Sequence, residues 1–188
     1  MATSKECGRG SLLPMVNEAA RRGEEYFARW RACAPAAFSA TMDALGRGDD
    51  PKVREAWKAS LGLIAGTCMS IGTCGAVSGA VMALSHSFGF TPEDIDRDPA
   101  KMLKVLTAVT ELGKRVQEAY GHIQCQEIQF SHWGKSYRFT NPDAFAEFRA
   151  FEIDERSGFK CRKLTGEVSG WAVESILKHN PGFRRRED

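Results

Sequence analysis

The chain has 188 residues, and its 26 lysines and arginines nearly balance its 24 aspartates and glutamates, for a formal net charge of +2. This balance gives no reason to expect nucleic-acid binding, and the length suits one well-filled core. The N-terminus lacks the pattern of a signal peptide, and no apolar run is long enough to cross a membrane. We therefore expect a soluble cytoplasmic protein with a flexible leader, 1–11, one domain, 12–179, and a charged tail, 180–188.

Apolar residues at spacings of three and four predict helices along most of the chain. The first helix is expected over 12–30, and the second over 35–45, where Pro35 fits a first turn and glycines follow. Asp50 and Pro51 then form an N-cap and a first helical residue, which open a third helix.

Three glycines within 62–72 interrupt the helical pattern. They predict a kink or short loop that delivers Cys68 and Cys74 into a central helix. The central helix should end near Gly89, and Thr91 should cap a short helical turn after it.

A longer helix is expected to begin at Asp98 and to stop near Gly121. Apolar residues recur along it as a core-facing stripe should: Leu103, Leu106, Val109, Leu112 and Val116. An aromatic stretch follows, then a helix capped by Asn141 and a final helix between Cys161 and Asn180. No segment shows convincing strand alternation, so we predict an all-α, single-domain bundle of about six to eight helices.

The cysteines are the candidates for chemistry: Cys7, Cys33, Cys68, Cys74, Cys125 and Cys161. A reducing compartment gives little reason to keep them as structural disulfides. The absence of a Cys-x-x-Cys pair excludes a zinc ribbon, a thioredoxin motif and a bacterial ferredoxin run. Cys7 lies in the expected leader, where we interpret it as incidental.

Small residues surround Cys74, with Gly75 and Gly79 four positions apart and Ala76 and Ala80 four positions apart. One face of a helix here would be nearly bare backbone. Either a tightly packed neighbouring helix or a compact group on Cys74 would fit against that face.

Four of the cysteines lie in segments that resemble the redox-active protein family named for the pattern C_GCAxxG_C_C. Residues 74–79, CGAVSG, stand where this family carries its Cys-Gly-Ala-x-x-Gly motif. Residues 32–36 are similar to the first cysteine site, 120–128 to the third, and 158–161 to the fourth. The resemblance implies a redox role, while the biochemical activity of the family is usually unassigned.

The chain departs from the family pattern at Ala32, where asparagine is common, and at Arg162, where proline is common. Residues 161–166 also resemble a common form of the third site, which would leave the fourth unfilled. The assignment of 120–128 to the third site and 158–161 to the fourth accounts for all four cysteines, and we adopt it.

Our leading hypothesis is an iron–sulfur cluster held by four converging thiolates, in electron transfer or redox sensing. The ligands would be Cys33, Cys74, Cys125 and Cys161. Gly75 and Gly79 would leave room for the cluster and supply backbone N–H groups. The first alternative is thiol–disulfide chemistry without metal, with Cys68 as an accessory thiol. Structural zinc and buried cysteines without a cofactor are further alternatives.

One histidine is also a candidate for the cysteine site. His122 stands three residues before Cys125, so on a helical turn the two would share a face, and His122 is an accessory candidate. No catalytic triad, phosphate loop or dinucleotide fingerprint is evident, so neither a substrate nor an enzymatic activity is assigned. We expect an unidentified redox partner protein, and a homodimer is a further expectation.

Overall fold

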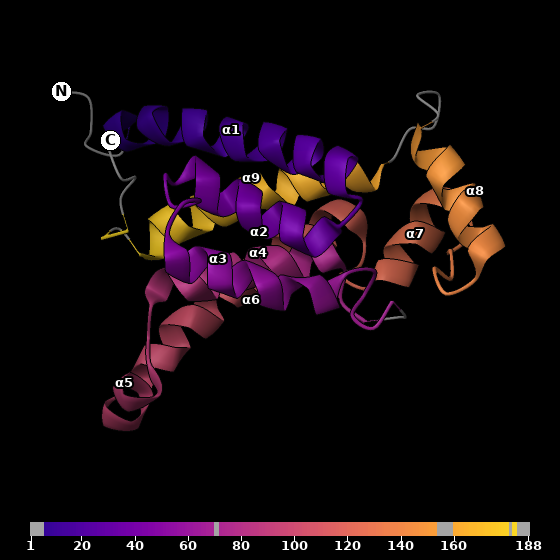
Figure 1. Ribbon diagram of the computed structural model, residues 1–188. Helices are drawn as coiled ribbons and strands as arrows, with labels where there is room; N and C mark the ends of the chain where they lie inside the picture. The colour runs from indigo at the N-terminus through magenta and orange to yellow at the C-terminus, as the bar shows by residue number, and fades with distance from the viewer. Residues whose placement is uncertain (1–5, 70–71, 154–159, 181, 184–188) are drawn as a thin grey trace.

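The structure, a computed structural model, describes residues 6–69, 72–153, 160–180 and 182–183, with side chains from residue 12 onward. The described residues form nine α-helices and one short 3₁₀ helix, η1, and no strand (Figure 1), which confirms the all-α prediction. The elements are α1 (Glu6–Trp30), α2 (Cys33–Ala44), α3 (Pro51–Ser60), η1 (Leu61–Leu63), α4 (Gly75–Phe88), α5 (Pro92–Arg97), α6 (Ala100–Tyr120), α7 (Cys125–Trp133), α8 (Pro142–Ile153) and α9 (Cys161–His179).

Local signals set several of these boundaries as predicted. The Asp50 side chain accepts a hydrogen bond from the backbone N–H of Lys52 at the start of α3. Thr91 and Asp94 form a reciprocal capping box on α5. The helix α1 begins at Glu6 rather than near Leu12, so part of the expected leader is helical, while residues 1–5 lie outside the described residues.

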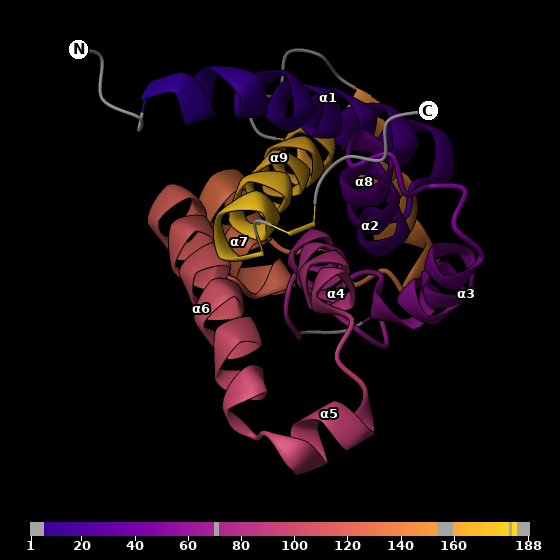
Figure 2. The ribbon, with the colours of Figure 1, turned by 90° about the vertical axis from the view of Figure 1, so that its left-hand side faces the viewer.

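The core is a group of helices in which α1 lies along α9 and α2, with α4 beneath them (Figures 1 and 2). The buried side chains of α2, α4 and α9 are mostly small or aliphatic, which allows the helices to approach closely. At Gly166 of α9, a Cβ atom would lie only 2.5 Å from the carbonyl oxygen of Ala20 in α1. The α1–α9 contact therefore depends on a glycine.

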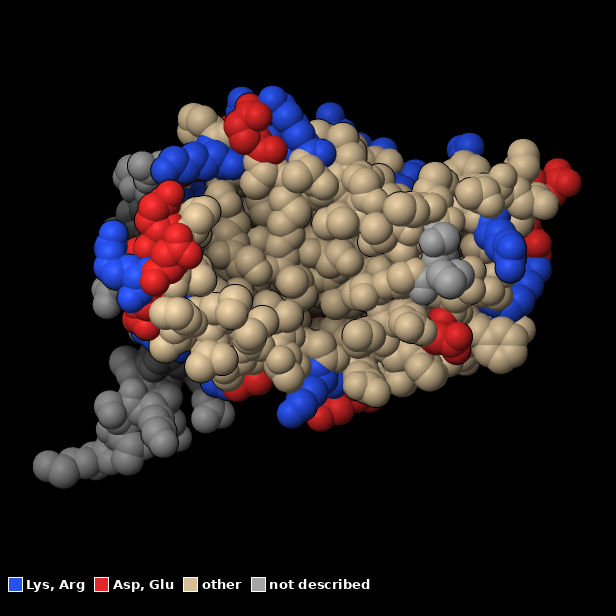
Figure 3. Space-filling model, turned by 90° about the horizontal axis from the view of Figure 1, so that it is seen from below, with Lys and Arg blue, Asp and Glu red and all other residues tan. Residues whose placement is uncertain are grey.

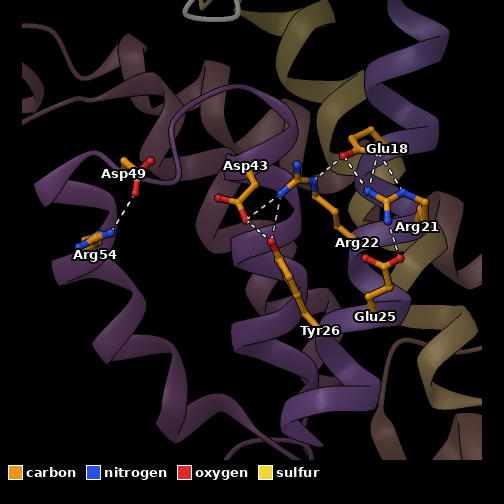
Figure 4. Close-up of polar contacts among 8 residues, drawn as sticks. All are labelled: Glu18, Arg21, Arg22, Glu25, Tyr26, Asp43, Asp49 and Arg54. Atoms are coloured by element: carbon orange, nitrogen blue, oxygen red, sulfur yellow. Dashed lines mark hydrogen bonds and ion pairs between the residues drawn. The ribbon is translucent and has the colours of Figure 1, made fainter. Parts of the chain in front are cut away.

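Hydrogen bonds and an ion pair also connect α1 to α2 (Figure 4). The Tyr26 hydroxyl donates to Asp43 Oδ2 at 2.6 Å, and the Arg22 guanidinium lies 3.6 Å from the same oxygen. Arg22 also donates to Glu18 at 2.6 Å. Burial and the hydrogen bond to Asp43 raise the pKa of Tyr26, so its hydroxyl remains a donor.

The predicted apolar stripe of α6 is only partly in the core. Leu112 and Val116 are buried, but Leu103 and Leu106 are 61% and 48% exposed. The N-terminal half of α6 extends beyond the bundle toward α5 (Figure 2), so the expectation that these two leucines face the core was wrong.

Beside this part of α6 is a mostly uncharged surface. A groove of about 670 Å³ between α4 and α6 is lined by apolar residues, among them Val81, Met82 and Val109, and by polar residues that include Lys114. Figure 3 shows that this face is mostly uncharged and hollowed in its middle, with charged side chains toward its edges. Within the described residues, no helix is long and apolar enough to cross a membrane.

Candidate cysteine site

Each of four cysteines lies at the N-terminal end of a different helix. Cys33, Cys125 and Cys161 are the first residues of α2, α7 and α9, and Cys74 is the N-cap residue of α4. Backbone N–H groups in the first turn of a helix lack partners within the helix, and this end carries partial positive charge. The four helices therefore present N–H groups and positive dipole ends where the thiols lie.

The thiols converge on one cavity. A cavity of about 350 Å³ is lined by Cys33, Cys68, Cys74, Cys125 and Cys161. All five are free thiols in the structure; Cys74 and Cys125 are buried, Cys33 and Cys161 are half-buried, and Cys68 is exposed. The side chain of the sixth cysteine, Cys7, lies outside the described residues.

Backbone hydrogen bonds hold Cys74 and Cys125 together. The N–H of Cys74 donates to the carbonyl of Ile123 at 2.8 Å, and the N–H of Cys125 donates to the carbonyl of Gly72 at 3.0 Å. These bonds flank an isolated antiparallel bridge between residues 73 and 124. Two segments distant in sequence are thus fixed side by side, which places the start of α7 against the start of α4.

Gln129 orients Cys125 from the next turn of α7. Its amide nitrogen lies 3.3 Å from Cys125 Sγ, and its amide oxygen accepts the backbone N–H of Tyr137 at 2.8 Å. Gln129 is buried, and both ends of its amide are bonded. The side chain therefore provides a fixed donor to this sulfur.

The small residues of α4 make room for α2. A Cβ atom on Gly75 would lie 2.4 Å from Cys33 Sγ, and one on Gly79 would lie 2.1 Å from the carbonyl oxygen of Ala34. The bare face thus carries a neighbouring helix. Neither glycine is among the residues that line the cavity, and both lie against α2. The cofactor contact that the sequence analysis expects of Gly75 and Gly79 stays a prediction.

The environment favours protonated thiols while no metal is bound. Burial raises the pKa of Cys33, Cys74 and Cys161, and it raises the pKa of Cys125 to about 12. Neighbouring thiolates would raise the pKa values of Cys74, Cys125 and Cys161 further, because like charges repel. Backbone N–H groups, including that of Ala65, oppose the rise at Cys33. A metal that binds here must release protons.

A buried carboxyl group that the sequence analysis missed lies beside Cys161. Glu152 is 3% exposed, and its Oε1 accepts the N–H of Cys161 at 2.7 Å. Burial raises the pKa of Glu152, and within the described part of the chain its Oε2 makes no hydrogen bond. Glu152 caps α9 from α8, a tertiary contact that no local sequence signal indicates.

The two accessory candidates, Cys68 and His122, are placed differently from the prediction. Cys68 lies in a loop and not in the central helix. We call residues 61–69 the strap; Ala65 to Met69 all have positive φ angles, although only Gly66 among them is a glycine. Each non-glycine residue in this conformation costs roughly 1 kcal/mol.

His122 is exposed, lies before α7 and does not line the cavity, so its position does not support a role in the site.

The donor set of the cavity is all sulfur. Among the described residues, no group of three or more His, Cys, Asp or Glu side chains lies close enough to hold a single metal ion. Zinc requires four donors at about 2.0–2.3 Å from one point. Four cysteine sulfurs are the donor set of iron–sulfur clusters and of structural zinc sites alike.

The fold and site define an all-α protein with a shared cysteine cavity. Residues 31–175, which contain these four cysteines, match the family model described as "Putative redox-active protein (C_GCAxxG_C_C)", and the chain belongs to this family. Searches of the curated proteins and of the solved structures found no match.

Proposed function

We propose that the protein binds an iron–sulfur cluster through four cysteines and acts in electron transfer or redox sensing. The ligands would be Cys33, Cys74, Cys125 and Cys161. The observation that carries the proposal is their convergence on one cavity from four separate helix N-termini. Such a cluster would supply reversible electron transfer at potentials set by its surroundings.

The residues around the thiols would stabilise the negative charge of such a group. Gln129 donates to Cys125 Sγ, and backbone N–H groups of α4, including that of Ala76, act to lower the pKa values of Cys33 and Cys74. Hydrogen bonds to ligand sulfurs raise the reduction potential of a cluster. Apolar side chains around the same cavity, among them Phe27 and Leu164, would limit the access of water.

Metal-free thiol chemistry is the second candidate function, because Cys68 lines the same cavity as the other four thiols. Two thiols would then form one disulfide, releasing two protons and passing two electrons to a disulfide or peroxide oxidant. Cys68 is exposed and accessible to such an oxidant.

The two functions are separated by replacing one cysteine at a time with serine and measuring iron and acid-labile sulfide in protein purified without oxygen. Loss of iron in the Cys33, Cys74, Cys125 and Cys161 variants, with iron retained in Cys68→Ser, supports the cluster. Cys68→Ser is a matched control because its thiol lines the same cavity but is exposed. Iron-free protein in which Cys68→Ser abolishes disulfide exchange would favour thiol chemistry instead.

A further inference from the structure

The cavity has large apolar lining residues that four sulfur ligands do not explain. Phe139, Phe145 and Phe148 line it from α8 and the segment before it, and Leu61 and Met69 line it from the strap. The ring of Phe139 packs edge-on against Phe148, with centroids 4.8 Å apart, and against Phe145, with centroids 6.2 Å apart. Leu61, Met69 and Phe145 are 48%, 42% and 37% exposed, so large apolar side chains line the cavity and also meet solvent.

The polar groups around this cavity are few, and most are already bonded. Both ends of the Gln129 amide have partners, and the Thr165 hydroxyl donates to the carbonyl of Cys161 at 2.8 Å. Arg31 is the one charged side chain among the described residues that line the cavity. A molecule that enters would therefore gain mainly apolar contacts, and the arginine would disfavour a cation.

The volume is sufficient for an organic molecule. The cavity of about 350 Å³ is more than twice the ~150 Å³ that accommodates benzene in an engineered apolar cavity. Small-molecule sites are typically concave, mostly apolar and supplied with a few polar groups, as this cavity is.

We propose that the cavity binds a small apolar organic molecule, neutral or singly negative, against the cysteine site. Bound there, the molecule lies between the phenylalanines and the strap, with any acidic group near Arg31. The inference deepens the proposed function, on which its redox meaning rests, because it names the class of molecule that would lie beside the cysteine site. Binding itself does not require the metal.

The test is a fluorescence titration of the full chain, purified without oxygen, with 1-anilinonaphthalene-8-sulfonate, an apolar probe that carries one negative charge. We expect saturable binding of one probe per chain. Phe145→Gln should weaken this binding by about tenfold, since an apolar contact of this size contributes that order of affinity. Leu103→Gln is the matched control, because it removes an exposed apolar side chain from α6 and should leave binding unchanged.

A second readout locates the probe. Cys68 lines the same cavity and is exposed, so bound probe should slow its alkylation by iodoacetamide, measured by peptide mass spectrometry. The inference is overturned if no saturable binding occurs, if Leu103→Gln weakens binding as much as Phe145→Gln, or if Cys68 is not protected. Iron analysis of the same samples keeps the two proposals apart: iron without probe binding refutes only this inference, and probe binding without iron refutes only the cluster.

Discussion

Replacing Gly79 with alanine tests whether close contact between α2 and α4 positions the cysteines. The added Cβ would lie 2.1 Å from the carbonyl oxygen of Ala34, 2.8 Å from its carbonyl carbon and 2.9 Å from its Cα. All three are backbone atoms, so a side-chain rotation cannot relieve the clash. The helices must separate, and Cys33 at the start of α2 must move relative to Cys74.

The magnitude follows from two opposing effects. Alanine is favoured over glycine inside a helix by about 1 kcal/mol. Overpacking a core typically costs about 1–3 kcal/mol and occasionally more, and a backbone clash lies at the upper end of this range. We therefore expect Gly79→Ala to lower the free energy of unfolding by about 1–2 kcal/mol.

Gly113→Ala is the matched control, because Gly113 is also inside a helix and the described residues leave the space above it open. This variant should be more stable than the parent by about 0.5–1 kcal/mol. Urea denaturation followed by circular dichroism measures both values, and iron content reports the effect on the site. Equal or greater stability of Gly79→Ala would refute the close-contact argument, and so would equal effects of the two substitutions.

Three other predictions concern protons, the α1–α2 network and assembly. Because burial raises the thiol pKa values in the folded chain, the metal-free protein should keep its full stability below the ordinary thiol pKa of about 8.5. It should lose stability as pH rises toward the value of about 12 at Cys125, and urea midpoints that stay constant across this window would contradict the assignment. Tyr26→Phe should lower the free energy of unfolding by about 1 kcal/mol, because Asp43 loses a donor; an unchanged urea midpoint would show that this bond contributes nothing. If the chain forms the expected homodimer, the groove between α4 and α6 is its candidate interface, and Thr110→Glu, at an exposed residue that lines this groove, should then yield a monomer by light scattering; a dimer that survives this change uses another surface.

The sequence was most informative where structure is set locally. Asp50 and Thr91 cap α3 and α5 as predicted, because their hydrogen bonds span only a few residues. The end of α4 at Gly89 was also predicted, and its φ angle of 63° explains the choice of glycine. Such signals require no knowledge of neighbouring helices.

The predictions that were wrong or missing share one cause: each concerned a contact between elements that are distant in the sequence. Helical spacing identified the apolar stripe of α6, but it could not show that Leu103 and Leu106 lie on the part of α6 that extends beyond the bundle and are exposed there. The small residues of α4 were recognised, but their partner, α2, was not. Glu152 carried no local signal, because its contact with Cys161 joins two different helices.

The positions of four cysteines could be predicted from the sequence, and the position of Cys68 could not. Placement near helix ends suggested that Cys33, Cys74, Cys125 and Cys161 converge, and the structure brings them to one cavity. Cys68 was expected in the central helix but lies in the strap, whose run of positive φ angles in mostly non-glycine residues has no clear sequence pattern.

The most direct test of the cluster is a visible absorption spectrum of the full chain purified without oxygen, with iron, acid-labile sulfide and zinc measured on the same sample. We predict a brown protein with matched iron and sulfide and little zinc, and loss of the colour in Cys74→Ser. A colourless protein without iron, or one that holds zinc alone, would contradict the proposal that these four cysteines bind an iron–sulfur cluster.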